Sequence, residues 1–187
     1  MIICFIRHGM TAFNTEHRYL GRTDEPLCSK GIAEIVKKSY PYVNDVVCSP
    51  MKRCIETANI IYPHKKPMVA DDLRECDFGL FEGKNYKELS GDPYYQKWLD
   101  SMGTIPFPNG ESPDEFKNRC ISAFESVMKE LSGSESAAFV VHGGTIMSVM
   151  ERYALPKREF YDYQLKNGEG YLCSYNGKNI KVIGEIK

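Results

Sequence analysis

The sequence has no long apolar segment and no excess of charge of either sign. No uninterrupted apolar run approaches the roughly 20 residues that a membrane-spanning helix requires. The formal net charge is −1 across 187 residues, whereas proteins that bind nucleic acids generally carry a basic excess. We therefore expect neither a membrane nor a nucleic acid as a partner. Because the first apolar run begins at Ile2, we also expect no signal peptide ahead of it.

Paired cysteines and several cofactor motifs are missing as well. The chain has seven cysteines, an odd number, without a CxxC pair, and most of them lie within apolar runs. This usage is typical of small buried side chains in a reducing compartment, so we expect a cytoplasmic protein. The sequence also lacks a Walker lysine loop, a GxGxxG dinucleotide motif and an HExxH zinc helix. We predict neither a bound metal ion nor a cofactor.

What the sequence does contain is the composition of an ordinary globular domain. Its 187 residues, 42% of them hydrophobic and 26% charged, suffice for one well-packed core but are few for two. Short apolar runs alternate with segments of helical periodicity. This alternation predicts an α/β fold, a three-layer α/β/α sandwich around a mostly parallel sheet, in a single domain of residues 1–187. The oligomeric state is left open, with a homodimer among the options.

The apolar run of residues 2–6 predicts a buried central strand, and it is followed by Arg7, His8 and Gly9. Such a strand delivers a cation and an imidazole to the carboxyl end of the sheet, where open α/β sheets place their ligands. Gly9 allows the backbone to turn sharply beside them. Two solvated polar residues at a strand edge would show the same pattern, so these three residues do not decide between a site and a surface.

A second apolar run, residues 137–141, also ends in a histidine and glycines, namely His142, Gly143 and Gly144. A single histidine after a buried strand is usually structural. Two histidines at two strand exits are harder to explain in that way. The glycines open a predicted helix, whose N-terminus would add backbone N–H groups and a positive dipole beside the histidine.

Another short strand, predicted over residues 45–48, leads into Ser49 and Pro50, which are typical of the N-cap and the first residue of a helix. If the strands are parallel, this start places Arg53 at the same edge of the sheet as the histidines. Several hydrogen-bond donors then surround one point, an arrangement suited to a phosphate. These donors come from Arg7, Arg53, His8 and His142.

Four segments of the chain, in this order, resemble motifs of the histidine phosphatase superfamily, which includes the phosphoglycerate mutases. Together they span nearly the whole chain, which makes the resemblance specific although each motif alone would be weak. The segments are Arg7-His8-Gly9 with Thr11 and Asn14, Ser49-Pro50 with Arg53 and Thr57-Ala58, Leu73-Arg74-Glu75 with Phe78-Gly79 and Glu82-Gly83, and Val141-His142-Gly143.

The resemblance implies a role for each of five residues. The implied nucleophile is His8 and the implied proton donor is Glu75, while the implied phosphate pocket consists of Arg7, Arg53 and His142. The implied reaction is hydrolysis of a small phosphorylated metabolite through a phosphohistidine intermediate. Further candidates for substrate binding are Asn14, Thr11, Gly21 and Gly143.

One departure from the family pattern bears on the activity. In cofactor-dependent phosphoglycerate mutases a tryptophan is followed by two arginines that hold the carboxylate and the second phosphate, whereas no arginine pair follows Trp98 here. Residues 21–27 and 108–112 resemble the phosphatase branch, including the α-ribazole phosphatases of cobalamin biosynthesis. We therefore predict a phosphomonoesterase, with α-ribazole 5'-phosphate as a candidate substrate. A mutase-type phosphotransferase and a catalytically inactive phospho-ligand binding module are the alternatives.

Residues 84–111 form an insertion ahead of a strongly predicted amphipathic helix and are rich in aromatic side chains. We predict that this insertion contains short helices near residues 86–89 and 93–102 and folds over the pocket as a lid. Tyr95 and Trp98 are candidates for stacking on a flat, apolar leaving group such as a nucleoside-like base. Packing of the same rings onto the rest of the fold, without contact to substrate, is the alternative.

Overall fold

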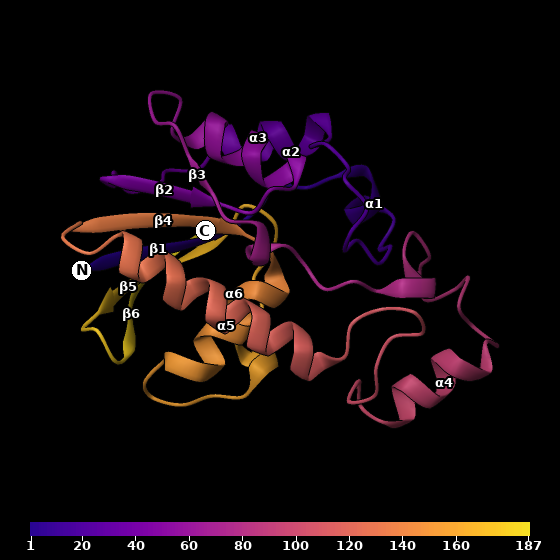
Figure 1. Cartoon of the computed structure of the whole chain (residues 1–187). Helices are drawn as coiled ribbons and strands as arrows, with labels where there is room; N and C mark the ends of the chain where they lie inside the picture. The colour runs from indigo at the N-terminus through magenta and orange to yellow at the C-terminus, as the bar shows by residue number, and fades with distance from the viewer.

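A six-stranded sheet forms the centre of the computed structural model, which describes residues 1–187 (Figure 1). The strands are β1 (Ile2–Arg7), β2 (Asp45–Cys48), β3 (Met68–Val69), β4 (Ser136–Val141), β5 (Gly170–Tyr175) and β6 (Ile180–Ile186). Their order in the sheet is β3-β2-β4-β1-β5-β6. Neighbouring strands from β3 to β1 run parallel, whereas β5 and β6 form an antiparallel hairpin beside β1. The predicted mostly parallel sheet is therefore confirmed.

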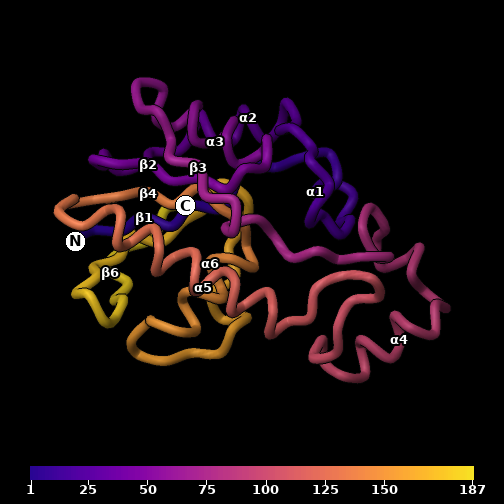
Figure 2. The backbone as a smooth tube through the Cα atoms, in the orientation of Figure 1, coloured from indigo at the N-terminus to yellow at the C-terminus, as the bar shows by residue number.

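Helices cover both faces of this sheet. They are α1 (Ala12–Thr15), α2 (Ser29–Val36), α3 (Lys52–Ile61), α4 (Pro93–Asp100), α5 (Pro113–Glu130) and α6 (Gly143–Tyr153). The pair α2 and α3 lies on one side and the pair α5 and α6 on the other, which gives the predicted three layers (Figures 1 and 2). None of these helices combines the length and the apolarity that crossing a bilayer would need.

The central strand β1 is buried on both faces. Ile3 and Phe5 belong to the apolar cluster on the α5 and α6 side, and Cys4 and Ile6 belong to the cluster that includes Cys54 of α3. Full burial of a side chain such as isoleucine contributes roughly 1.5–3 kcal/mol. A strand that gains this energy on both faces is most stable in the middle of the sheet, which explains why its sequence is continuously apolar instead of alternating.

The register of the strands sets the position of the polar residues that follow them. Arg7, the last residue of β1, pairs with Val141, the last residue of β4. Because the two strands are parallel, His8 and His142 leave the sheet side by side at its carboxyl edge. The neighbouring strand β2 ends at the same edge and brings Ser49 beside them.

The helix after β2 begins later than predicted. Met51 is the N-cap of α3, so Ser49 does not cap this helix. Ser49 is instead buried, and its hydroxyl oxygen lies 2.7 Å from Nε2 of His142. The hydroxyl of Ser49, which the local sequence pattern assigned to the start of a helix, therefore contacts His142 from a distant segment of the chain. Arg53 still lies in the first turn of α3, where it is fully buried.

The insertion of residues 84–111 contains one α-helix, not two. Its helix is α4, whereas residues 86–89 form turns. The insertion lies at the right of Figure 1, beyond the N-terminal end of α5. A separate cluster of buried side chains packs it onto the start of α5, and the aromatic members of this cluster are Phe81, Tyr95, Phe107 and Phe116, with Trp98 packed against them.

Candidate active site

His8 lies where β1 leaves the sheet, and the backbone fixes its ring. The side chain is buried, and Nδ1 lies 2.7 Å from the carbonyl oxygen of Gly9. Because a carbonyl oxygen only accepts, Nδ1 carries the proton and Nε2 of the neutral ring keeps a free lone pair. Burial, together with the charges of Arg53 and Arg7, lowers the pKa of His8 well below its ordinary value of 6.5. The ring is therefore neutral near neutral pH, as a histidine nucleophile must be.

His142 takes the corresponding position after β4. Its ring centroid lies 5.2 Å from that of His8, and the two ring planes are inclined by 66°. Nε2 of His142 lies 2.7 Å from Oγ of Ser49 and 3.5 Å from Sγ of the buried Cys54. Burial and then the charge of Arg53 lower the pKa of His142 well below 6.5. The two strand ends that share a sequence pattern thus place two neutral imidazoles beside each other.

Backbone carbonyl groups hold the two arginines of the site. Arg7 donates from Nη1 to the carbonyl oxygen of Leu165 at 2.6 Å. Arg53 donates from Nη1 and Nη2 to the carbonyl oxygens of Thr23 and Gly21, each at 2.8 Å. The Nε atom of each arginine is buried and has no hydrogen-bond partner. Two oriented guanidinium groups with unused donors, both close enough to lower the pKa values of the two histidines, form a site suited to phosphate.

Glu75 is the carboxylate of the site. Its Oε1 accepts from the N–H of Cys76 at 3.0 Å, and its Oε2 accepts from the N–H of Gly144, at the start of α6, at 3.2 Å. Burial raises the pKa of Glu75 above its usual 4.5, although the two hydrogen bonds and the charges of Arg53 and Arg7 act in the opposite direction. A carboxyl group with a raised pKa can give a proton to a leaving group and later take one from water.

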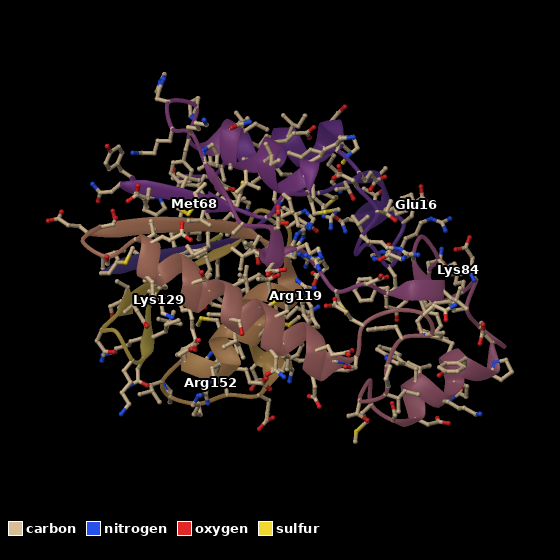
Figure 3. All side chains as sticks on the ribbon, viewed as in Figure 1. Glu16, Met68, Lys84, Arg119, Lys129 and Arg152 are labelled. Carbon is tan, nitrogen blue, oxygen red and sulfur yellow. The ribbon has the colours of Figure 1, made fainter.

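Arg119 of α5 holds the segment that carries Glu75. This side chain, labelled near the centre of Figure 3, donates to the carbonyl oxygens of Asp72, Arg74 and Glu75 at 2.8, 3.0 and 3.3 Å. It is also paired with Glu111 at 2.6 Å. Sequence reasoning missed Arg119, because an arginine within an amphipathic helix normally indicates only a solvated face.

Glu82 holds the segment whose carbonyl groups fix Arg53. Its carboxylate accepts from the N–H of Gly21 at 3.0 Å and from the hydroxyl of Thr23 at 2.9 Å. A Cβ atom added at Gly21 would lie 1.8 Å from the carbonyl oxygen of Cys76, so the close approach of these segments requires glycine. Gly21, expected among the substrate-binding residues, therefore acts by packing and by orienting Arg53.

A cavity of about 690 Å³ lies over His8. Its lining includes the site residues Arg7, Asn14, Glu75 and Gly143. Aromatic side chains form much of the remaining wall, and these belong to Phe78, Trp98, Phe107, Phe116, Phe160 and Tyr161. The cavity therefore combines charged groups suited to a phosphoryl group with a large aromatic share of its wall.

The structure places the expected substrate-binding residues in two groups. Asn14, Gly143 and Trp98 line the cavity, whereas Thr11 and Tyr95 do not, and neither does Gly21. Thr11 is fully buried and caps α1, because its hydroxyl accepts from the N–H of Asn14. Tyr95 is buried in the aromatic cluster of the insertion. For these residues the position in the fold indicates a supporting role, not contact with substrate.

Comparison with known proteins identifies the family. The sequence model of the histidine phosphatase superfamily (branch 1) matches residues 3–184. Phosphoglycerate mutase-like protein 4 of Arabidopsis thaliana is 33% identical over 98% of this chain and 85% of its own length. An uncharacterized phosphatase of Bacillus subtilis (strain 168) is 28% identical over 88% of this chain and 83% of its own length.

Solved structures show the same architecture. A phosphoglycerate mutase from Thermus thermophilus is 25% identical and aligns over 100% of this chain and 99% of its own, with a TM-score of 0.74. An alpha-ribazole phosphatase from Shigella flexneri aligns over 97% of this chain and 94% of its own, with a TM-score of 0.86, and its 21% identity shows a shared fold only. The family model matches almost the whole chain, and the structure brings two buried histidines together at adjacent strand exits. This chain therefore belongs to the histidine phosphatase superfamily.

Proposed function

We propose that this protein is a phosphomonoesterase that hydrolyses small monophosphate esters through a phosphohistidine on His8. The observation that carries this proposal is the neutral, buried ring of His8, held by the carbonyl of Gly9 so that Nε2 is free. The unpartnered Nε group of Arg7, which lines the cavity, supports it as a donor for a phosphoryl group, and the fully buried Arg53 has a second Nε without a partner.

The proposed reaction has two steps. Arg7 and Arg53 bind the equatorial oxygens, and Nε2 of His8 attacks phosphorus in line with the leaving oxygen. The bond between phosphorus and that oxygen breaks as Glu75 gives it a proton, so the leaving group departs as an alcohol. Glu75 then takes a proton from a water molecule that attacks phosphohistidine, which releases inorganic phosphate and neutral His8. His142 and the N–H groups at the start of α6 stabilise the charge on the phosphoryl oxygens.

The pairing of the cations around the cavity favours hydrolysis over a mutase reaction. Arg18 forms ion pairs with Glu16 and Glu88 at 2.5 and 2.6 Å, and Lys117 forms one with Glu151 at 2.7 Å. A mutase has to hold a second anionic group of its substrate, and unpaired cations would serve this purpose. Apart from Arg7, the cations that line this cavity are Arg18 and Lys117, and both are already paired with carboxylates, which supports a substrate with a single anionic group.

The aromatic wall supports a flat and uncharged leaving group. Phe78, Trp98 and Phe107 lie along the cavity beyond the catalytic residues. Stacking on such rings is worth about 0.5–1.5 kcal/mol beyond the burial of the same area. We therefore include monophosphates that carry a nucleoside-like base in the proposal, with α-ribazole 5'-phosphate as the specific candidate. The shared fold of the alpha-ribazole phosphatase from Shigella flexneri makes this compound a reasonable test.

The proposal is tested with purified protein and a small set of substrates. The set contains α-ribazole 5'-phosphate, a nucleoside monophosphate, p-nitrophenyl phosphate and 3-phosphoglycerate, the last with and without a bisphosphoglycerate. We expect release of inorganic phosphate with the highest kcat/KM for the base-bearing esters. Isomerisation of phosphoglycerate that needs the bisphosphorylated compound would instead assign a mutase. Binding of phosphate without any turnover would assign a binding module.

The covalent intermediate provides the second test. Rapid acid-free quenching during turnover should trap a phosphoryl group on His8, identified by mass spectrometry of peptides at alkaline pH. His8→Ala should abolish both the intermediate and turnover, whereas His64→Ala, at an exposed position, is the matched control and should change neither. Because His8 is buried, the melting temperature of each variant has to be recorded alongside.

A further inference from the structure

A loop far from His8 in the sequence is bonded to the backbone on which His8 sits. This loop, residues 165–169, immediately precedes β5 and is called the 165–169 loop below. The N–H of Gly168 donates to the carbonyl oxygens of Arg7 and His8 at 3.0 and 3.2 Å, and the N–H of Arg7 donates to the carbonyl oxygen of Glu169 at 2.9 Å. The loop therefore follows the exit of β1 through several backbone hydrogen bonds.

Asn167 is the side chain of this loop that reaches the nucleophile segment. Its Nδ2 lies 3.1 Å from the carbonyl oxygen of His8, 3.4 Å from that of Gly9 and 3.1 Å from Oδ1 of Asn14. The N–H of Thr11 donates to the same Oδ1 at 3.1 Å, which identifies that atom of Asn14 as the acceptor. All three partners of Asn167 are acceptors, so the orientation of its amide group is determined by the network.

Two of these contacts, to the carbonyl oxygen of Gly9 and to Oδ1 of Asn14, act on groups beside the proposed nucleophile and the cavity. The carbonyl oxygen of Gly9 is the acceptor that keeps the proton on Nδ1 of His8. The N–H of the same Gly9 is tied to Oγ1 of Thr57 at 2.9 Å, so this residue is held from two sides. Oδ1 of Asn14 accepts from the N–H of Thr11 and from Nδ2 of Asn167. Because Asn14 lines the cavity, its amide nitrogen is then the group that can donate to a ligand there.

We infer that Asn167 is a positioning residue that holds the His8 tautomer and the donor group of Asn14 at the same time. The inference rests on the proposed role of His8 as the nucleophile. A purely structural role would consist of anchoring the 165–169 loop. That anchoring is already provided by the backbone bonds described above and by the hydroxyl of Tyr40, which donates to the carbonyl oxygen of Gly168 at 2.9 Å.

The first test reads the tautomer of His8 directly. Ring ¹⁵N chemical shifts distinguish a proton on Nδ1 from one on Nε2, and the His8 signals are assigned by their loss in His8→Ala. We expect the wild-type ring to be protonated at Nδ1 only, and Asn167→Ala to show a mixture of both tautomers. The matched control is Asn176→Ala in the turn between β5 and β6. The Asn176 side chain is likewise bonded to the backbone, but as an acceptor, from the N–H groups of Lys178 and Asn179 at 3.0 and 2.7 Å. This control should leave the His8 signals unchanged.

The second test uses kinetics. Asn167→Ala should lower kcat for p-nitrophenyl phosphate by about ten- to a hundredfold, as expected for a small misplacement of a reacting group. Asn167→Asp has nearly the same shape, but its carboxylate cannot donate and would repel the three acceptor oxygens. We therefore expect Asn167→Asp to lower kcat more than Asn167→Ala does. In a variant that already carries Asn14→Ala, Asn167→Ala should lower kcat by a smaller factor than in the wild type. The reason is that Oδ1 of Asn14, one of the two groups that Asn167 is inferred to position, is already absent.

The outcomes separate this inference from the proposed function. A wild-type enzyme without phosphatase activity, whose Asn167→Ala variant nevertheless changes the His8 tautomer, would overturn the function but support the positioning role. An active wild type whose Asn167→Ala variant keeps a single His8 tautomer would overturn the positioning role. A loss of activity that merely follows a lower melting temperature, with additive effects of Asn14→Ala and Asn167→Ala, would do the same.

Discussion

The carboxyl edge of the sheet, called the catalytic edge below because it carries the proposed catalytic residues, and the insertion of residues 84–111 are held together by different forces. At the edge, polar groups such as the buried His8 and the half-buried Glu75 are fixed by directional bonds to the backbone. Around the insertion, aromatic rings meet edge to face, as in the pair Phe81 and Tyr95, with centroids 5.4 Å apart and planes at 87°. Directional bonds set the positions of atoms that react, whereas ring packing mainly sets the shape and apolarity of a surface. A small change of side chain should therefore reduce activity strongly at the catalytic edge and only slightly in the insertion.

The largest effect is expected from a single methyl group at the catalytic edge. A Cβ atom at Gly144 would lie 2.4 Å from Oε1 of Glu75 and 2.8 Å from the ring of Phe116, so the carboxylate would have to move. Gly144→Ala should reduce kcat/KM by about a hundredfold. At the adjacent Gly143 the nearest atom to an added Cβ is Nε of Arg7 at 3.5 Å, an ordinary contact. Gly143→Ala is the matched control and should reduce kcat/KM far less. Equal reductions in the two variants would contradict the expected displacement of Glu75.

The second effect depends on the leaving group. If Glu75 supplies the proton, Glu75→Gln should slow hydrolysis of alkyl phosphates by about a hundredfold or more. Hydrolysis of p-nitrophenyl phosphate should slow much less, because its phenolate leaves without a proton. The measurement is the ratio of kcat/KM for the two substrates, with Glu130→Gln at an exposed position of α5 as the control. An unchanged ratio would remove Glu75 from the acid role.

The third effect concerns stability and pH. The pKa values of His8 and His142 are lowered in the folded protein by burial, so the unfolded chain takes up protons first as the pH falls through about 6.5. The free energy of unfolding should therefore drop by about 1.5 kcal/mol for the two histidines between pH 7.5 and 6. The raised pKa of Glu75 acts in the opposite sense, since its contribution is lost as the pH rises.

Urea denaturation across this pH range measures the effect, and a variant isolates one histidine. His8→Asn should remove about half of the pH dependence. The exposed His64 provides the control, because His64→Asn should leave the pH dependence as it is. A slope that does not respond to His8→Asn would mean that His8 does not titrate differently in the two states.

The smallest effect is expected in the insertion, where two stacked rings can be compared. Trp98 and Tyr95 lie nearly parallel, with centroids 6.2 Å apart and planes at 10°, but only Trp98 lines the cavity. Trp98→Leu should raise KM for base-bearing phosphates by about two- to tenfold and leave p-nitrophenyl phosphate turnover nearly unchanged. Tyr95→Leu should lower the melting temperature without changing this selectivity. If both variants lose stability alone, the rings of the insertion only pack.

Sequence reasoning succeeded where one local pattern indicates both that a strand is buried and where the polar residue after it lies. The apolar runs before His8 and His142 predicted buried strands, and the parallel register then places both histidines at one edge. It was wrong about the role of Ser49 and about the conformation of residues 86–89. Ser49 was predicted to cap a helix and instead contacts His142. Residues 86–89 were predicted to be helical, but the chain forms turns there before α4 starts at Pro93.

By itself, the sequence determined which strands are buried, the residues available for phosphoryl chemistry and the family to which the chain belongs. Apolar periodicity and glycine placement are local properties, so they can be recognised without coordinates. Only the tertiary structure decided what holds these residues in place. Arg119 and Asn167 look like ordinary polar residues in the sequence, and the motif that contains Glu82 does not reveal its contact with Gly21. Their partners are remote, as with Asn167 and Asn14, which are 153 positions apart. Such hydrogen bonds form only after the strands are assembled, because their strict distance and angle requirements depend on the whole fold.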